Sequence, residues 1–135
     1  MRRALCVTLL LLAAGCGVKG VEGHYEGTVS GSIVVIGIPL PVLGNIEFDL
    51  VAAGGDLFRA TGDLVVRRKS DGVVTYEANL SGDYVAGQLS LTFVATDGKS
   101  SGTMKGGWSN QCFHDGTWTI SGTATSGSGS WEACR

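Results

Sequence analysis

Few residues in this chain of 135 are suited to chemistry, and several of them lie near the C-terminus. Cys112 and Cys134 are 22 residues apart, and His114 is followed directly by Asp115. An imidazole beside a carboxylate can bind a metal ion or polarise a hydroxyl group, but tetrahedral zinc sites need a cluster of Cys and His ligands. The sequence contains no nucleophile elbow, no zinc-protease motif and no Gly-rich phosphate loop. We therefore predict no metal, no cofactor and no catalytic residue, and we interpret His114 and Asp115 as a solvated turn.

Four carboxylates are further candidates for acid and base catalysis. They alternate with apolar residues and are therefore expected to point to the outside of a sheet: Glu26, Glu47, Asp49 and Asp63. Their spacing does not indicate the paired carboxylates of a glycosidase-type site. The sequence thus favours a protein that is not an enzyme.

The three tryptophans are candidates for ligand binding, because aromatic side chains often line the pockets that hold small apolar molecules. Trp108, Trp118 and Trp131 all belong to the inward-facing residues of the last three predicted strands. Two interpretations stay open. The tryptophans either line an internal pocket or form part of a packed core.

The elements that must position these residues are strands, because hydrophobic and polar residues alternate through most of the chain after residue 24. Turn signals rich in Gly, Asp and Ser separate the alternating runs. No stretch with helical periodicity follows the N-terminal region. The pattern predicts strands over residues 25–35, 46–50, 58–66, 74–80, 89–95, 104–108, 118–124 and 129–133.

Short strands joined by short turns are typical of an antiparallel meander. Glycines on the inward-facing side would let the strands bend sharply enough to close a small barrel. We predict an all-β domain over residues 24–135, folded as a small antiparallel up-and-down β-barrel of about eight strands, with a β-sandwich as the alternative. The outward residues are mostly Thr, Ser, Asp, Glu and Arg, whereas a barrel that spans a membrane needs an apolar outer face.

Residues 33–43 break the alternation, because they are apolar on both faces and contain both prolines of the chain. The prolines argue against a central strand. We predict a loop at a barrel mouth, which either contacts lipid, a partner or a ligand or folds over the barrel end and plugs it. The candidate contact residues are Ile38, Pro39, Leu40, Pro41, Val42 and Leu43.

The first 15 residues have the organisation of an export signal. Arg2 and Arg3 form the charged start, residues 4–12 form the apolar stretch, and small residues then lead to Cys16. The uncharged run over residues 4–18 is shorter than the roughly 20 residues that a membrane-spanning helix needs. We predict that residues 1–15 are a signal peptide.

The segment Leu12-Ala13-Ala14-Gly15-Cys16 resembles the lipobox of bacterial lipoproteins. In that family the Cys thiol is acylated with diacylglycerol, and the Cys becomes the new N-terminus after cleavage. The resemblance implies a palmitate-type lipid on Cys16, a short tether over residues 16–23, and attachment to a membrane of the cell envelope. Gly17 follows the Cys where Asp would favour the inner membrane, so the resemblance implies the outer membrane in a diderm cell.

Export also decides how Cys112 and Cys134 are interpreted. Cys6 leaves with the leader and Cys16 carries the lipid, so these two cysteines remain in an oxidising compartment. An even pair there is most simply a disulfide, with free thiols or a metal site as alternatives. Closing the loop between them would add about 3 kcal/mol to the free energy of unfolding.

The charge balance argues against nucleic acid as a partner. Without the leader, eight Lys and Arg stand against twelve Asp and Glu, whereas nucleic-acid affinity comes mainly from basic residues that neutralise phosphates. Arg67, Arg68 and Lys69 form a single basic cluster, which we interpret as a solvated strand end and turn. The sequence thus predicts a lipid-anchored envelope protein of binding or structural role, with a partner in the envelope. A lipocalin-like carrier of a small apolar ligand in the barrel interior is the alternative.

Overall fold

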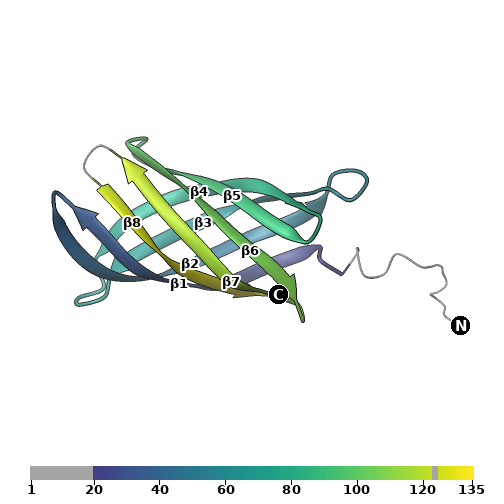
Figure 1. The fold of residues 1–135 in the computed structure, drawn as a ribbon, viewed down its shortest axis with the longest axis horizontal. Coiled ribbons are helices and arrows are strands. Elements are labelled where there is room, and N and C mark those ends of the chain that lie inside the picture. The colour runs from purple at the N-terminus through teal and green to yellow at the C-terminus, as the bar shows by residue number, and fades with distance from the viewer. Residues whose placement is uncertain (1–19, 123–124) are drawn as a thin grey trace, which may run out of the picture.

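Eight antiparallel strands close into one up-and-down β-barrel in the computed structural model, which describes residues 20–122 and 125–135 (Figure 1). Each strand pairs with its neighbours in chain order, and β1 closes the barrel by pairing with β8. The predicted barrel is confirmed, and the sandwich alternative is wrong. The described residues include no helix that is long and apolar enough to span a membrane. The strands are β1 (Gly23–Val35), β2 (Ile38–Ala52), β3 (Phe58–Arg68), β4 (Val74–Val85), β5 (Gln88–Ala95), β6 (Ser100–Ser109), β7 (Cys112–Gly122) and β8 (Thr125–Cys134).

The barrel has two ends that differ in the connections they carry (Figure 1). The end that we call the terminal end contains the start of β1, the end of β8, and the β2–β3, β4–β5 and β6–β7 turns. The opposite end, the hairpin end, contains the β1–β2, β3–β4 and β5–β6 turns. All eight predicted strands are present, and most of them are longer than the alternating pattern indicated.

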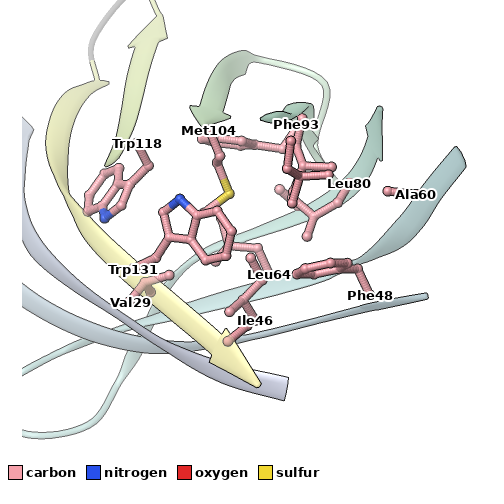
Figure 2. Packing of buried hydrophobic residues seen from close by; sticks show 14 of the residues in the cluster. Val29, Ile46, Phe48, Ala60, Leu64, Leu80, Phe93, Met104, Trp118 and Trp131 are labelled. Carbon is pink, nitrogen blue, oxygen red and sulfur yellow. The ribbon is translucent and has the colours of Figure 1, made fainter. Parts of the chain in front are cut away.

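Every second side chain points into the barrel and joins one apolar core (Figure 2). Among the described residues, no polar or charged residue is fully buried. The core is continuous from the terminal end, with Tyr25 and Phe113, to Ile33 and Ile120 near the hairpin end. The predicted alternation of inward apolar and outward polar residues is therefore confirmed.

Inward-facing glycines allow the strands to approach closely enough to close this small barrel. A Cβ atom at any of six of them would lie within 2.2 Å of a carbonyl oxygen on a neighbouring strand, which is too close for a real side chain. The backbone of the neighbouring strand therefore occupies the space that a side chain would need. The six are Gly27, Gly44, Gly62, Gly82, Gly102 and Gly129.

The predicted loop over residues 38–43 is wrong, because these residues form the first part of β2. Pro39 pairs with Val34 of β1, and β3 reaches only as far as the pair of Val42 with Arg68. Residues 38–41 thus extend past β3 and form an edge on that side. The amide of Lys69 donates to the carbonyl oxygen of Pro41 (2.9 Å), so the backbone polar atoms of Pro41 face this edge.

The position of the prolines explains why a strand tolerates them. In an antiparallel strand the N–H and C=O of one residue point to the same side, and residues two apart share that side. Pro39 and Pro41 therefore both place their missing N–H groups toward the open edge rather than toward β1. Prolines are disfavoured where a strand is paired on both sides. Here they lie in a part of β2 that pairs with β1 but not with β3, so the chain forms a strand where the prolines predicted a loop.

Candidate functional site

Trp118 and Trp131 belong to the packed core. Their side chains are 2% and 3% exposed, and Figure 2 shows both rings among other buried side chains such as Met104. The indole N–H of Trp118 donates to the carbonyl oxygens of Ser30 (3.0 Å) and Ser130 (3.1 Å). The N–H of Trp131 is shared in the same way between two backbone carbonyl oxygens, each at 3.2 Å.

Glycines make room for both rings. A Cβ at Gly116 would lie 2.4 Å from the Trp131 ring, and one at Gly129 would lie 2.7 Å from the Trp118 ring. Each indole therefore packs flat against backbone and has its polar atom satisfied. The packed-core interpretation describes these two tryptophans, and the interior that they occupy is filled.

Trp108 lies elsewhere and is only half-buried, at the terminal end of β6. Its indole N–H donates to the hydroxyl of Tyr25 (3.1 Å), and that hydroxyl donates to the carbonyl oxygen of Val21 (2.6 Å). A hollow of about 290 Å³ opens beside it, and neither Trp118 nor Trp131 lines it. We call it the terminal hollow; its lining residues are Val21, Asp56, Phe58, Tyr84, Ala86, Gly87 and Trp108.

Aromatic rings packed edge to face lie beneath the terminal hollow. The Tyr84 ring meets Phe58 (centroids 6.1 Å apart) and Phe113 (5.8 Å) edge to face. The rings of Phe113 and Tyr25 also pack edge to face, with their centroids 5.0 Å apart. Burial raises the pKa of Tyr25 and of Tyr84 above the ordinary tyrosine value, so both phenols are uncharged at neutral pH.

The disulfide between Cys112 and Cys134 is present and confirms the predicted pairing. It joins the first residue of β7 to the last residue of β8, which are direct cross-strand partners. The bond closes the terminal end of the barrel beside the C-terminus. In the chain-entropy picture a loop of this length stabilises the fold by about 3 kcal/mol.

His114 and Asp115 lie within β7 rather than in the predicted turn. The pairing of β7 with β8 is irregular between Phe113 and Gly116, and Asp115 has a positive φ of 53° at this bulge. Both side chains are exposed and line a shallow outer hollow of about 400 Å³. The described residues contain no group of three Cys, His, Asp or Glu side chains that could hold a metal ion.

The hairpin end presents apolar side chains to solvent. Ile36 is 80% exposed and Ile38 61%, and Leu43 and Val73 are also exposed. Ile36 and Gly37 form a two-residue turn with φ values of 51° and 78°, the conformation of a type I′ hairpin turn. A β-branched residue rarely adopts this left-handed conformation, which costs about 1 kcal/mol or more. Of the other predicted contact residues, Val42 is buried in the core, Leu40 is half-buried, and Pro39 and Pro41 are exposed.

The predicted basic cluster flanks this apolar surface. Arg67 and Arg68 end β3 and Lys69 begins the turn, as the sequence indicated. Arg68 donates to both carboxylate oxygens of Asp71, with the shortest contact at 2.6 Å, and this pairing raises the pKa of Arg68 and lowers that of Asp71. Together with Leu43, the three basic residues line an outer groove of about 350 Å³.

An acidic row on the outer face was missed by sequence reasoning, although each member was expected to face outward. Glu26 pairs across strands with Glu47, and Glu47 pairs with Asp63. His24 lies at one end of this row and contacts Asp49 through Nδ1 (2.7 Å) and Glu26 through Nε2 (3.1 Å). Only the register of β1 against β2 reveals the contact of His24 with Asp49, because these two residues are 25 positions apart in the sequence.

The predicted leader and Cys16 lie outside the described residues. The described chain enters the barrel at the terminal end, where Val21 is 2% exposed and β1 begins at Gly23. The last part of the predicted tether therefore packs onto the barrel. The hydroxyl of Tyr25 and the guanidinium of Arg135 hold this segment, since Arg135 donates to the carbonyl oxygen of Glu22 at 2.7 Å.

These observations define the class of the protein by its fold: a closed, eight-stranded, antiparallel up-and-down β-barrel with a filled apolar interior. Comparison with protein-family models, curated proteins and solved structures gave no match to this chain. The function is therefore inferred from the chain's own residues.

Proposed function

We propose that this protein is a lipid-anchored, non-enzymatic binding protein of the cell envelope, tethered through Cys16, with the hairpin end as its contact surface. In a diderm cell the predicted location is the outer membrane. The export signal and the lipobox resemblance support the anchor. The barrel then serves as a rigid body that holds one hairpin away from the membrane.

The observation that carries the proposal is a pair of isoleucines at one hairpin tip, which are the two most exposed large hydrophobic residues of the described chain; Val51 and Val85 near the terminal end are exposed singly. Ile36 and Ile38 are largely exposed at the tip of the β1–β2 hairpin, at the end opposite to the point where the tethered chain enters. Exposed apolar surface of this kind usually marks a contact. Ile36 also occupies a left-handed turn position where Asn or Gly is favoured, so its side chain is exposed at a cost in backbone strain.

The alternative of a carrier with its ligand in the barrel interior has less support. An interior site needs space, and Trp118 and Trp131 pack against backbone glycines in the middle of the core. Their indole N–H groups are already bonded to backbone carbonyl oxygens. Neither of these two indoles therefore offers a free N–H group to a ligand in the interior.

The anchor is tested by metabolic labelling of the full chain with an alkyne-bearing palmitate analogue in a bacterial host. We expect label on the wild-type protein, loss of label in Cys16→Ser, and full label in Cys6→Ser as the matched control. Label that persists in Cys16→Ser, or that is absent from the wild type, would contradict the proposed anchor.

The contact surface is tested with a photo-crosslinking residue placed in turn at Ile36 and at Val51, which is 59% exposed on β2 close to the terminal end. We expect the probe at position 36 to give one adduct of defined mass in cells, and the probe at position 51 to give none. The adduct should disappear when Ile38→Asp is added to the same protein. Equal adducts from both positions would show that the hairpin end is not a specific surface.

A further inference from the structure

We propose that the terminal hollow binds one alkyl chain of the lipid carried by Cys16. The inference rests on the proposed function for the presence of that lipid, but the hollow and its chemistry are properties of the described residues. The evidence consists of the size of the hollow, the nature of its walls, and its position relative to the lipidated end of the chain.

The terminal hollow has the size of a site for a single chain. Its volume of about 290 Å³ is just below the roughly 300–1,000 Å³ that small-molecule sites occupy, so it has room for no more than one chain. Barrel mouths are frequent locations for such sites. The aromatic rings of Phe58, Tyr84 and Trp108 and the side chain of Val21 supply apolar walls, and the carboxylate of Asp56 is exposed to solvent.

Apart from the solvent-exposed carboxylate of Asp56, the polar side chains at the hollow have hydrogen-bond partners or stay uncharged. The Trp108 indole N–H is bonded to the Tyr25 hydroxyl, and the Tyr25 hydroxyl to the Val21 carbonyl oxygen. Burial raises the pKa of the Tyr84 phenol, which therefore stays neutral. An alkyl chain that enters would cover these groups without leaving Trp108 or Tyr25 unpaired, so its apolar area would be buried at little polar cost.

The chain itself delivers the lipid to this place. Val21 lines the hollow and is fixed there, and Cys16 is five residues earlier in the sequence. Five residues span at most about 17 Å when fully extended. The terminal hollow, which Val21 itself lines, therefore lies within the reach of a lipid on Cys16.

The experiment uses the mature lipidated protein with fluorotryptophan in place of tryptophan, so that each of the three indoles gives one fluorine NMR signal. A lipase then removes the ester-linked acyl chains from half of the sample. We expect the Trp108 signal to move on deacylation and to return on titration with hexadecanoate, while the Trp118 signal stays in place as the internal reference. In the acylated sample hexadecanoate should leave the Trp108 signal unchanged.

A matched pair of variants tests the site itself. Tyr84→Glu places a charge in the wall of the hollow and should weaken hexadecanoate binding to the deacylated protein at least tenfold. Val85→Glu, one residue further on the same strand and 49% exposed, should leave binding unchanged. A native Trp118 signal in each variant shows that the barrel is folded.

Three results would overturn the proposal, and one separates it from the proposed function. A Trp108 signal that ignores deacylation would show that no chain of the protein's own lipid occupies the hollow. A hexadecanoate response of equal size in both samples would make the ligand a free fatty acid. Equal binding by Tyr84→Glu and wild type would place the ligand elsewhere. A mass spectrum without lipid on Cys16 would refute the anchor, and hexadecanoate titration of that protein would still show whether the hollow takes an alkyl chain.

Discussion

The two ends of the barrel are built in opposite ways. At the terminal end, a disulfide, an aromatic cluster and side-chain hydrogen bonds join segments that are far apart in the sequence. At the hairpin end, β2 extends past β3 and exposes Ile36 and Ile38 to solvent. One end stabilises the closed barrel, and the other keeps an apolar tip exposed at a cost in backbone strain.

The edge of β2 shows how such a tip can be tolerated. An open strand edge is a template for pairing with another chain, because it offers unpaired N–H and C=O groups. Pro39 and Pro41 remove the two N–H groups that this edge would offer, and the Pro41 carbonyl oxygen is bonded to Lys69. The hairpin can therefore make contacts through its side chains while its backbone resists strand addition.

Trp131→Ala is expected to have the largest effect on stability. Removing a fully buried indole leaves a cavity and two backbone carbonyls without their donor, so we expect the free energy of unfolding to fall by about 4 kcal/mol. Trp108→Ala, at the half-buried rim of the terminal hollow, should lower it by only about 1–2 kcal/mol. Urea unfolding followed by far-UV circular dichroism measures both, and equal losses would refute the distinction between core and rim tryptophans.

Removing the disulfide tests the terminal end next. The double variant Cys112→Ser and Cys134→Ser should lose about 3 kcal/mol of unfolding free energy, because the unfolded chain regains the freedom of the open loop. Reduction of the wild-type protein should reproduce the loss, whereas the double variant should not respond to the reductant. The comparison of the two ends would fail if the variant were as stable as wild type.

At the hairpin end a substitution should have the opposite sign. Ile36→Asn places a residue suited to the left-handed conformation before Gly37, and we expect the free energy of unfolding to rise by about 1 kcal/mol. Ala86 has the equivalent position in the β4–β5 turn, with a φ of 54° and no branched side chain, so Ala86→Asn should give a smaller gain. Thermal unfolding of both variants measures the difference. A loss of stability in Ile36→Asn would show that the isoleucine contributes to the fold rather than to a contact.

The sequence predicted the closed barrel because alternation is a local property that the barrel preserves on every strand. It missed the first part of β2 for a physical reason: both faces of residues 38–43 are apolar and the prolines remove donors, so the pattern resembles a loop. The disulfide was predicted from the expected compartment and from the cysteine count, since the predicted cleavage and lipidation would leave two cysteines to pair.

What the sequence left undecided depends on register and on volume. The three tryptophans share one phase, but only the placement of glycines on neighbouring strands decides that Trp118 and Trp131 fill the core. Trp108 lies at the terminal end instead, where it lines the terminal hollow. The contact of His24 with Asp49 likewise needs the pairing of β1 with β2, which no local pattern contains.

His24 gives the smallest predicted effect. Its hydrogen bond to Asp49, and then the neighbouring Glu26, raise the pKa of the imidazole above 6.5, although partial burial acts against them. Because the folded-state pKa is higher than the unfolded one, the stabilisation is fully present below pH 6.5 and is lost as the pH rises through the folded-state pKa. NMR titration of the imidazole should give a pKa above 6.5 in wild type and a lower one in Asp49→Asn, while Asp83→Asn, on β4 and paired with Arg59, should leave it unchanged. An imidazole that titrates at the ordinary value in wild type would show that Asp49 and Glu26 do not stabilise its charged form.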